Sequence, residues 1–457
     1  MSAGSVKNAR PAGRSDVFHR FPRNDMATAA GGEGPYIFDT SGKRYIDGSS
    51  GAAVSSLGHG HPRIAEAMKR QIDHITFAHT SFFTSEPAEE LASLLTDLAP
   101  GDLSKVYFTS GGSESVEAAL KLARQYYVEK GETSRHRIIS RAQSYHGNTL
   151  GALAAGGNLW RREAYTPLLL ETIQTPAVYP YREKQDSETD EAYGRRVADE
   201  LEAAILREGP ENVMCFIVET VAGATIGTVP PPPGYFARIR EICDKYGVLL
   251  ILDEVMCGMG RTGTLFAFEQ ENIAADIVTL AKGLGAGYAS IGATITTTKI
   301  YDTIVSGSGF FQHGHTYTGH PLACATALEA QKLIAEEDLL SNVRKQAANL
   351  EAALQSRFGQ HPNVGDIRGR GLFQSLEFVS DRESKAPLDP SLKFASKLKA
   401  AGLAEGLLCY PMGGVIDGRS GDHAMLAPPF IVNESHIEEI VDKLDRAIDA
   451  ALGAARQ

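Results

Sequence analysis

An acid and an amine each follow a short apolar run near the middle of the chain. The run Val248–Leu252 leads to Asp253 and Glu254, and the run Ile277–Ala281 leads to Lys282. Both runs are rich in branched residues and have the length of strands that are buried on both faces. Because ligands bind at the carboxyl ends of the strands in an open α/β sheet, these charged side chains predict a binding site.

Asp253 and Lys282 together could serve a pyridine cofactor. A lysine amine forms a Schiff base with an aldehyde, and a carboxylate holds a pyridine nitrogen protonated, which lets the ring accept electrons. Those are the requirements of pyridoxal 5′-phosphate (PLP). The alternative is a structural ion pair or two strand-end charges that face water, which is the more common arrangement for an arbitrary Asp and Lys. The functional interpretation is supported because burying a lysine costs free energy unless its amine is paired or takes part in a reaction.

A glycine-rich turn before a helix offers a place for the phosphate of such a cofactor. Val106–Phe108 is a short predicted strand, and Gly111, Gly112 and Ser113 lie between it and a segment with apolar residues at helical spacing. A helix that starts in this way presents free backbone N–H groups and the positive end of its dipole. Glycine and serine also precede many helices simply as caps, so the turn alone leaves both interpretations open.

The segment around Lys282 resembles a family signature. The stretches LDEV, GMGRTG, FAFE, ADIVTLAKGLGAGY and IGA are similar to those of class III aminotransferases, which are fold-type I PLP enzymes and include the ω-transaminases. Further matches cover most of residues 35–430. The resemblance implies an α/β fold with a large, mostly parallel-sheet domain flanked by helices and a smaller α+β domain. It specifies the family but not the substrate.

The resemblance also implies which residues form the site. Lys282 and Asp253 are the implied catalytic residues. Tyr145, in the YHG segment, would stack on the pyridine ring, and Thr316 would reach the cofactor phosphate of a neighbouring subunit. The implied cofactor-binding residues are Gly111, Gly112, Ser113, Tyr145, His146, Glu219, Asp253, Val255, Lys282 and Thr316. The implied substrate-binding residues are Phe82 and Phe83, contributed across a dimer interface, together with Tyr145.

The chain departs from the family at the position of a substrate-binding arginine. Many ω-transaminases carry that arginine just after a strand that matches Gly406–Cys409, and Tyr410 stands there in this chain. Arg419, in the loop that follows, could bind a substrate carboxylate in its place. It could equally be a solvated loop charge, and the sequence leaves the two alternatives open.

The length of 457 residues favours more than one hydrophobic core. We expect residues 1–70 to be an N-terminal segment that is part of the small domain, residues 71–325 to be the large PLP-binding domain, and residues 326–457 to be the C-terminal small domain. Residues 1–15 are small, polar and basic, which is typical of a disordered segment or one that lies over a partner. The polar stretch from Pro176 to Arg196 is predicted to be a surface insertion.

The net charge and the cysteine content indicate which partners and which cellular compartment to expect. The net charge of −11 gives no reason to expect nucleic acid or an anionic membrane as a partner. The five cysteines are far apart and mostly among apolar residues, which favours buried thiols in a reducing compartment over disulfides. The histidine-rich segments GHGHP and HGHTYTGHP favour turns over a metal site, because no acid lies near them. The sequence contains no long apolar run and no secretion signal, so we expect a cytoplasmic protein.

These inferences together predict an aminotransferase that works by two half-reactions. An amine or amino acid would donate the amino group, and a 2-oxo acid such as pyruvate or 2-oxoglutarate would accept it, in a homodimer or a higher homo-oligomer. Another fold-type I activity, such as an aminomutase, a racemase or a decarboxylase, would use the same residues and is the alternative. A dehydrogenase is disfavoured because no G-x-G-x-x-G segment opens a βαβ unit.

Overall fold

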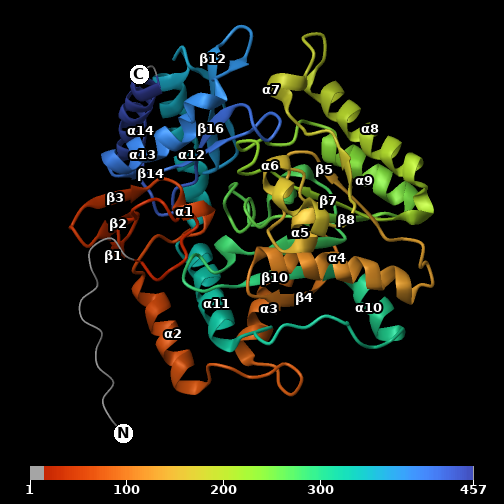
Figure 1. Cartoon of the computed structure of the whole chain (residues 1–457). Coiled ribbons are helices and arrows are strands. Elements are labelled where there is room, and N and C mark those ends of the chain that lie inside the picture. Colours follow the sequence, from red (N-terminus) through yellow and green to blue (C-terminus); the bar gives the residue numbers. More distant parts are fainter. Residues whose placement is uncertain (1–14, 456–457) are drawn as a thin grey trace.

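The computed structural model describes residues 15–455, and a seven-stranded sheet lies at its centre (Figure 1). The strand order is β4-β10-β9-β8-β7-β5-β6. The neighbours from β9 to β6 pair in parallel, whereas β10 is antiparallel to both β9 and β4. The predicted fold class, with a large and mostly parallel sheet, is confirmed. The strands are β4 (Leu103–Thr109), β5 (Arg137–Arg141), β6 (Ile173–Thr175), β7 (Val213–Glu219), β8 (Leu249–Asp253), β9 (Ile277–Leu280) and β10 (Gly292–Thr297).

The middle strands of this sheet are buried on both faces. Every residue of β7, β8 and β9 is buried. Successive residues of β8 alternate between two apolar clusters, so that Leu250 packs with Val197 and Ile239 while Ile251 packs with Val116. Continuous runs of branched residues form such strands because helices cover both faces.

Helices from both halves of the chain provide that cover. In Figure 1, α8 and α9 lie on one side of the sheet and α4 and α10 on the other. None of the described helices is both long enough and apolar enough to cross a membrane. The helices up to this point are α1 (Ser50–Ala53), α2 (Pro62–His74), α3 (Glu86–Leu98), α4 (Gly112–Glu129), α5 (Leu150–Ala155), α6 (Leu159–Arg162), α7 (Pro180–Glu183), α8 (Asp190–Glu208), α9 (Tyr235–Tyr246) and α10 (Thr298–Ser306).

Two smaller sheets lie beside the central one, and one of them joins the two ends of the chain. One has the order β1-β2-β3-β14, and β14 pairs in parallel with β3, which brings residues near Ile46 beside Leu407. The other contains β11, β12, β16 and β15, with β13 beside β12. The domain boundaries that we expect from the sequence stay a prediction, and the expectation for residues 1–14 lies outside the described residues. The strands are β1 (Ala29–Glu33), β2 (Tyr36–Asp39), β3 (Arg44–Asp47), β11 (Val364–Gly369), β12 (Gln374–Asp381), β13 (Ala386–Pro387), β14 (Leu407–Leu408), β15 (Tyr410–Gly413) and β16 (Asp422–Leu426).

Four helices complete this part of the chain. They are α11 (Pro321–Glu336), α12 (Leu339–Phe358), α13 (Phe394–Glu405) and α14 (Glu434–Ala455). Asp338, which lies between α11 and α12, has a φ of 48°. A left-handed residue cannot continue a right-handed helix, so the chain turns there.

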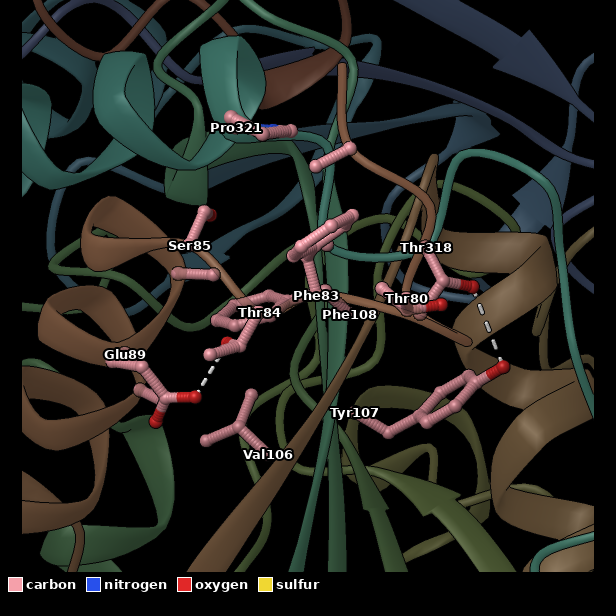
Figure 2. Close-up of a pocket in the computed structure, with 14 residues that line it drawn as sticks. Thr80, Phe83, Thr84, Ser85, Glu89, Val106, Tyr107, Phe108, Thr318 and Pro321 are labelled. Carbon is pink, nitrogen blue, oxygen red and sulfur yellow. Dashed lines mark hydrogen bonds between the residues drawn. The ribbon is translucent and has the colours of Figure 1, made fainter. Parts of the chain in front are cut away.

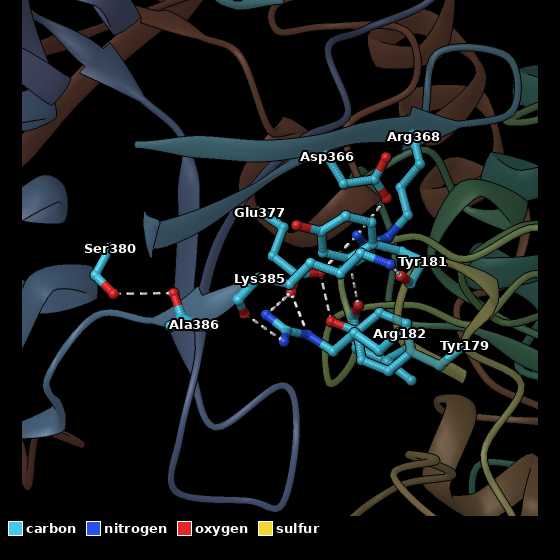
Figure 3. Close-up of polar contacts among 11 residues, drawn as sticks. Tyr179, Tyr181, Arg182, Asp366, Arg368, Glu377, Ser380, Lys385 and Ala386 are labelled. Carbon is cyan, nitrogen blue, oxygen red and sulfur yellow. Dashed lines mark hydrogen bonds and ion pairs between the residues drawn. The ribbon is translucent and has the colours of Figure 1, made fainter. Parts of the chain in front are cut away.

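A buried polar cluster corrects one expectation about the stretch Pro176–Arg196. The cluster is centred on Glu377 of β12, which is fully buried (Figure 3). Its carboxylate accepts hydrogen bonds from the Tyr179 hydroxyl, from Arg182 Nε at 2.7 Å and from Arg368 Nη1 at 2.6 Å. The residues from Tyr179 to Arg182 therefore connect the region of α7 to β12 in the interior of the protein. For these residues, the prediction of a surface insertion is wrong. The sequence alone does not reveal an acid almost 200 residues away.

We expect Glu377→Gln to destabilise the fold strongly. The neutral amide would leave the charge of Arg182 buried without a counter-ion and Arg368 with Asp366 alone, which costs about 3 kcal/mol or more. Urea denaturation should show the loss, and the exposed Glu383→Gln variant, which makes the same chemical change, should unfold like the wild type. Equal stability of Glu377→Gln and the wild type would show that the cluster contributes nothing to folding.

Candidate active site

A cavity of about 160 Å³ lies at the carboxyl edge of the central sheet. The pairing of Glu219 with Asp253 and of Asp253 with Thr279 aligns the ends of β7, β8 and β9 there. Eight of the ten predicted cofactor-binding residues line the cavity, and Gly111 directly precedes one of the eight, Gly112. The lining residues are Gly112, Ser113, Tyr145, His146, Gly147, Glu219, Val221, Ala224, Asp253, Val255, Met256 and Lys282.

Lys282 presents an unpaired amine to this cavity. It follows β9 after one residue and has a φ of 46°, a left-handed conformation that a lysine adopts only at a cost. Its Nζ makes no hydrogen bond or ion pair with the described residues, and its side chain stays partly exposed. Burial lowers the pKa of Lys282, while the nearby Asp253 and Glu219 raise it in part. The net effect is a lowered pKa, which is a shift towards the nucleophilic form of the amine.

Asp253 is paired with a histidine, not with the lysine. Its Oδ2 lies 2.7 Å from His146 Nδ1, and its Oδ1 accepts a hydrogen bond from the Val255 N–H at 3.0 Å. His146 is buried, and its Nε2 has no partner among the described residues. The structural ion pair between Asp253 and Lys282, which was the alternative from the sequence, is therefore not present.

A second carboxylate, that of Glu219, faces the same cavity. Its oxygens accept hydrogen bonds from the backbone N–H of Tyr145 at 3.1 Å and of Gly223 at 2.8 Å. Burial raises the pKa of Glu219, and the neighbouring Asp253 raises it further, against the lowering effect of His146. The acid thereby ties the loop that carries Tyr145 to the end of β7.

Glu254 lies on the other side of β8 and does not reach the cavity. Its oxygens accept hydrogen bonds from Thr220 Oγ1 at 2.8 Å and from the N–H groups of Ala267 and Phe268, each at 2.7 Å. Burial raises its pKa to about 7, and these hydrogen bonds partly oppose that rise. Successive side chains at the end of a strand point in opposite directions, so only one of the two adjacent acids enters the site.

The start of α4 forms one wall of the cavity at very close range. A Cβ on Gly112 would lie 2.8 Å from Val255 Cγ1, so only glycine fits between the helix and the end of β8. Ser113 Oγ donates a hydrogen bond to Asn148 Oδ1 and accepts one from the Asn148 N–H, both at 3.1 Å. The helix N-terminus, with its free N–H groups and partial positive charge, faces the cavity between Gly112 and Ser113.

This set of groups fits PLP. An unpaired amine, a buried carboxylate, a tyrosine ring and a helix N-terminus surround one cavity, and each matches one part of the cofactor: its aldehyde, its ring nitrogen, its ring face and its phosphate. Sequence reasoning did not find Asn148, which holds Ser113, or Val221, Ala224 and Met256, whose apolar side chains carry no signal of their own.

The remaining predicted residues do not line this cavity within one chain. Phe82 and Phe83 are 78% and 68% exposed. Phe83 lines a separate cavity of about 170 Å³, beside Tyr107 and Thr318, in Figure 2. Thr316 lines a second, more open hollow, which shares Tyr107 and Thr318 with the first.

Arg419 lies at the surface, outside the lining of the cavity. Its side chain is 75% exposed, and Nη2 is 3.0 Å from Oε1 of Glu163. Its role as a carboxylate ligand stays a prediction that requires this ion pair to break. Another arginine lies much closer: the Arg161 guanidinium is 4.6 Å from the centre of the Tyr145 ring, a contact that sequence reasoning missed.

Comparison with known proteins places the chain in a family. The family model of class III aminotransferases matches residues 21–448. An aminotransferase of Gibberella zeae is 45% identical over 419 residues, which are 91% of this chain and 82% of that protein. An aminotransferase of Bacillus subtilis is 39% identical over 92% of this chain and 94% of its own length.

Solved structures agree with these sequence matches. An (S)-enantioselective ω-transaminase from Thermomicrobium roseum superposes with a TM-score of 0.88 at 38% identity, covering 96% of this chain and 94% of that one. The ω-transaminase from Pseudomonas jessenii in complex with PMP superposes with a TM-score of 0.88 at 34% identity, covering 94% and 93%. The chain therefore belongs to the class III aminotransferases, enzymes that use PLP to catalyse transamination.

Proposed function

We propose that the Lys282 cavity is the transamination site, and that it moves an amino group from an amine or an amino acid to a 2-oxo acid such as pyruvate or 2-oxoglutarate. The observation that carries the proposal is the unpaired Lys282 amine beside Asp253, whose carboxylate is held by His146 instead. When bound, PLP supplies an aldehyde that condenses with amines and a ring that accepts electrons. The protein supplies the groups that bind it and that move protons.

Lys282 Nζ is the base and then the acid of this reaction. Burial lowers its pKa, which favours the form that can take the proton from the carbon that bears the donor's amino group. The resulting ammonium would give this proton up within the first half-reaction, and in the second half-reaction the same amine would carry a proton to the carbon that was the carbonyl carbon of the 2-oxo acid. Because Lys282 follows β9 directly, its amine stays at the sheet edge in both steps.

Asp253 and His146 hold the charge that the ring needs. The Asp253 carboxylate stays oriented because Oδ1 and Oδ2 are each held by a hydrogen bond, from Val255 and His146. A fixed negative charge in a buried site stabilises a nearby positive charge far better than the same charge in water. Gly111, Gly112 and Ser113 would hold the phosphate, and the ring of Tyr145 would cover the pyridine face.

We also propose that the active form is a homodimer or a higher homo-oligomer. Phe82, Phe83, Phe310 and Tyr317 are all more than half exposed, and large exposed apolar side chains near one another mark a contact surface. A two-fold partner would place Thr316 and the Phe82–Phe83 loop at the Lys282 cavity of the neighbouring subunit. The five free cysteines, four of them buried, support a reducing compartment and thus the cytoplasm.

Lys282 should carry the cofactor. The purified protein should be yellow, and borohydride should remove the colour and fix the cofactor covalently on Lys282, since its amine is the unpaired one at the cavity. Peptide mass mapping reads the position. A label on Lys245 or Lys299 instead would refute the assignment.

Asp253→Asn should bind PLP but turn over slowly. Loss of the buried negative charge should cost about 3 kcal/mol or more in the transition state, which is roughly a hundredfold in kcat. Steady-state kinetics at matched cofactor content measure the effect, and the exposed acid variant Asp244→Asn serves as the control. A kcat near that of the wild type would contradict the role of Asp253.

Complementation between inactive chains tests the shared site. Lys282→Ala chains and chains that carry Thr316→Ala with Phe82→Ala should each be inactive alone. Mixed dimers should recover activity, because one of their two sites then combines an intact Lys282 with an intact Thr316 and Phe82 from the other chain. Analytical ultracentrifugation should confirm the assembly, and a fully active monomer would end the proposal.

A further inference from the structure

The guanidinium of Arg161 lies beside the cavity without an acid to pair with. It stacks 4.6 Å from the centre of the Tyr145 ring, and Tyr145 is a wall of the cavity. Its Nη2 is 3.7 Å from the Met412 sulfur, which is a weak acceptor, and its Nε is buried with no partner. Among the described residues no carboxylate lies within ion-pair distance of it. A partly buried guanidinium without a counter-ion is costly, and a ligand that supplies the counter-ion would remove that cost.

Two other buried arginines of this chain have an acid in place, since Arg182 and Arg368 share the carboxylate of Glu377. Arg261 donates hydrogen bonds to the carbonyl oxygens of Leu372 and Pro428 and leaves its Nε and Nη2 without a partner, but it is fully buried and does not line the cavity. Arg161 differs from the first two because no described carboxylate pairs with it, and from Arg261 because it lies beside the cavity wall at Tyr145.

The backbone around Arg161 fixes where its side chain lies. Asn158 caps α6, with its Oδ1 accepting a hydrogen bond from the Arg161 N–H at 3.3 Å, and its Nδ2 donates to Gln143 Oε1 at 2.8 Å. Gln143 precedes Tyr145 by two residues and also donates to the Gly414 carbonyl at 3.3 Å. The segment that carries the tyrosine and the segment that carries the arginine are therefore tied together by side chains.

We propose that Arg161 binds the carboxylate of the 2-oxo acid acceptor, and of any α-amino acid donor. The Tyr145 ring holds the guanidinium beside the cavity, its Nε has no partner and its Nη2 has only the weak Met412 acceptor. A carboxylate that replaced the Met412 contact could accept from both of these N–H groups. Arg419, the candidate from the sequence, is instead paired with Glu163 at the surface. The inference rests on the proposed function, because it names the substrate group that the Lys282 cavity receives.

The electrostatics agree with this position. After burial, which raises the pKa of Tyr145, the charge of Arg161 is the next effect and lowers it. The same charge also contributes to lowering the pKa of Lys282, for which burial is the main cause. An acid held at Arg161 would thus lie within electrostatic reach of the reacting amine. Arg20, an exposed residue, is a second positive charge near Tyr145 and is the rival that the experiment must separate.

The test compares Arg161→Gln with Arg162→Gln, the neighbouring arginine, which makes no contact with Tyr145 among the described residues. Arg161→Gln should raise the KM for pyruvate about tenfold or more, as expected for loss of a charge-assisted hydrogen bond, while the single-turnover rate with 1-phenylethylamine changes by less than about twofold. Arg161→Lys should be intermediate, because it keeps the charge but not the paired N–H groups.

Calorimetric binding of propionate provides a readout that needs no turnover. Its Kd should rise about tenfold in Arg161→Gln and stay unchanged in Arg162→Gln, with propionamide as the uncharged control. Equal losses in both half-reactions, or a selective loss in Arg419→Gln or Arg20→Gln instead, would overturn the proposal. A wild-type protein that binds propionate through Arg161 but aminates no 2-oxo acid would refute the proposed function and leave the carboxylate site standing.

Discussion

The hydrogen bond between His146 and Asp253 keeps the Asp253 carboxylate out of a direct ion pair with Lys282. Because Asp253 is held by His146 and by the Val255 N–H, the amine of Lys282 has no counter-ion among the described residues. Burial then lowers the pKa of Lys282. A direct pair between Asp253 and Lys282 would instead favour the charged ammonium, which is neither a nucleophile nor a base. The pairing of Asp253 with His146 thus leaves the lowering effect of burial on the Lys282 pKa without a direct ion pair to oppose it.

Local patterns in the sequence predicted the frame of this site. The buried strands β8 and β9 are short runs of branched residues, and α4 shows apolar residues at helical spacing, so each element is visible within its own segment. The direction in which each side chain points at the end of a strand could not be predicted in the same way. Asp253 and Glu254 are two adjacent acids that the sequence does not distinguish. Asp253 lines the cavity, whereas Glu254 accepts a hydrogen bond from the Phe268 N–H.

Contacts between distant segments could not be predicted. Glu377 and Tyr179 are 198 residues apart, and Arg161 meets Met412 across 251 residues. In the sequence, each of these charged residues looks like an ordinary surface charge, because its burial depends on an element that folds against it from elsewhere. The same reason explains the prediction for Arg419, because its place in the loop after Tyr410 is visible in the sequence while its partner Glu163, 256 residues away, is not.

The predicted site residues lie in two regions of one chain, the Lys282 cavity and the surface around Tyr107. Tyr107 marks the second region, since its hydroxyl lies 3.1 Å from the His313 carbonyl oxygen and 3.4 Å from Thr318 Oγ1, and Phe83 lines a cavity beside it. The loops of Phe83 and Thr316 therefore lie on one face, and both would contact the same partner subunit. A two-fold axis that carries this face to the partner's Lys282 must carry the partner's face back, so two complete sites arise from one interface. The face would also explain why such large apolar side chains lie exposed in a single chain.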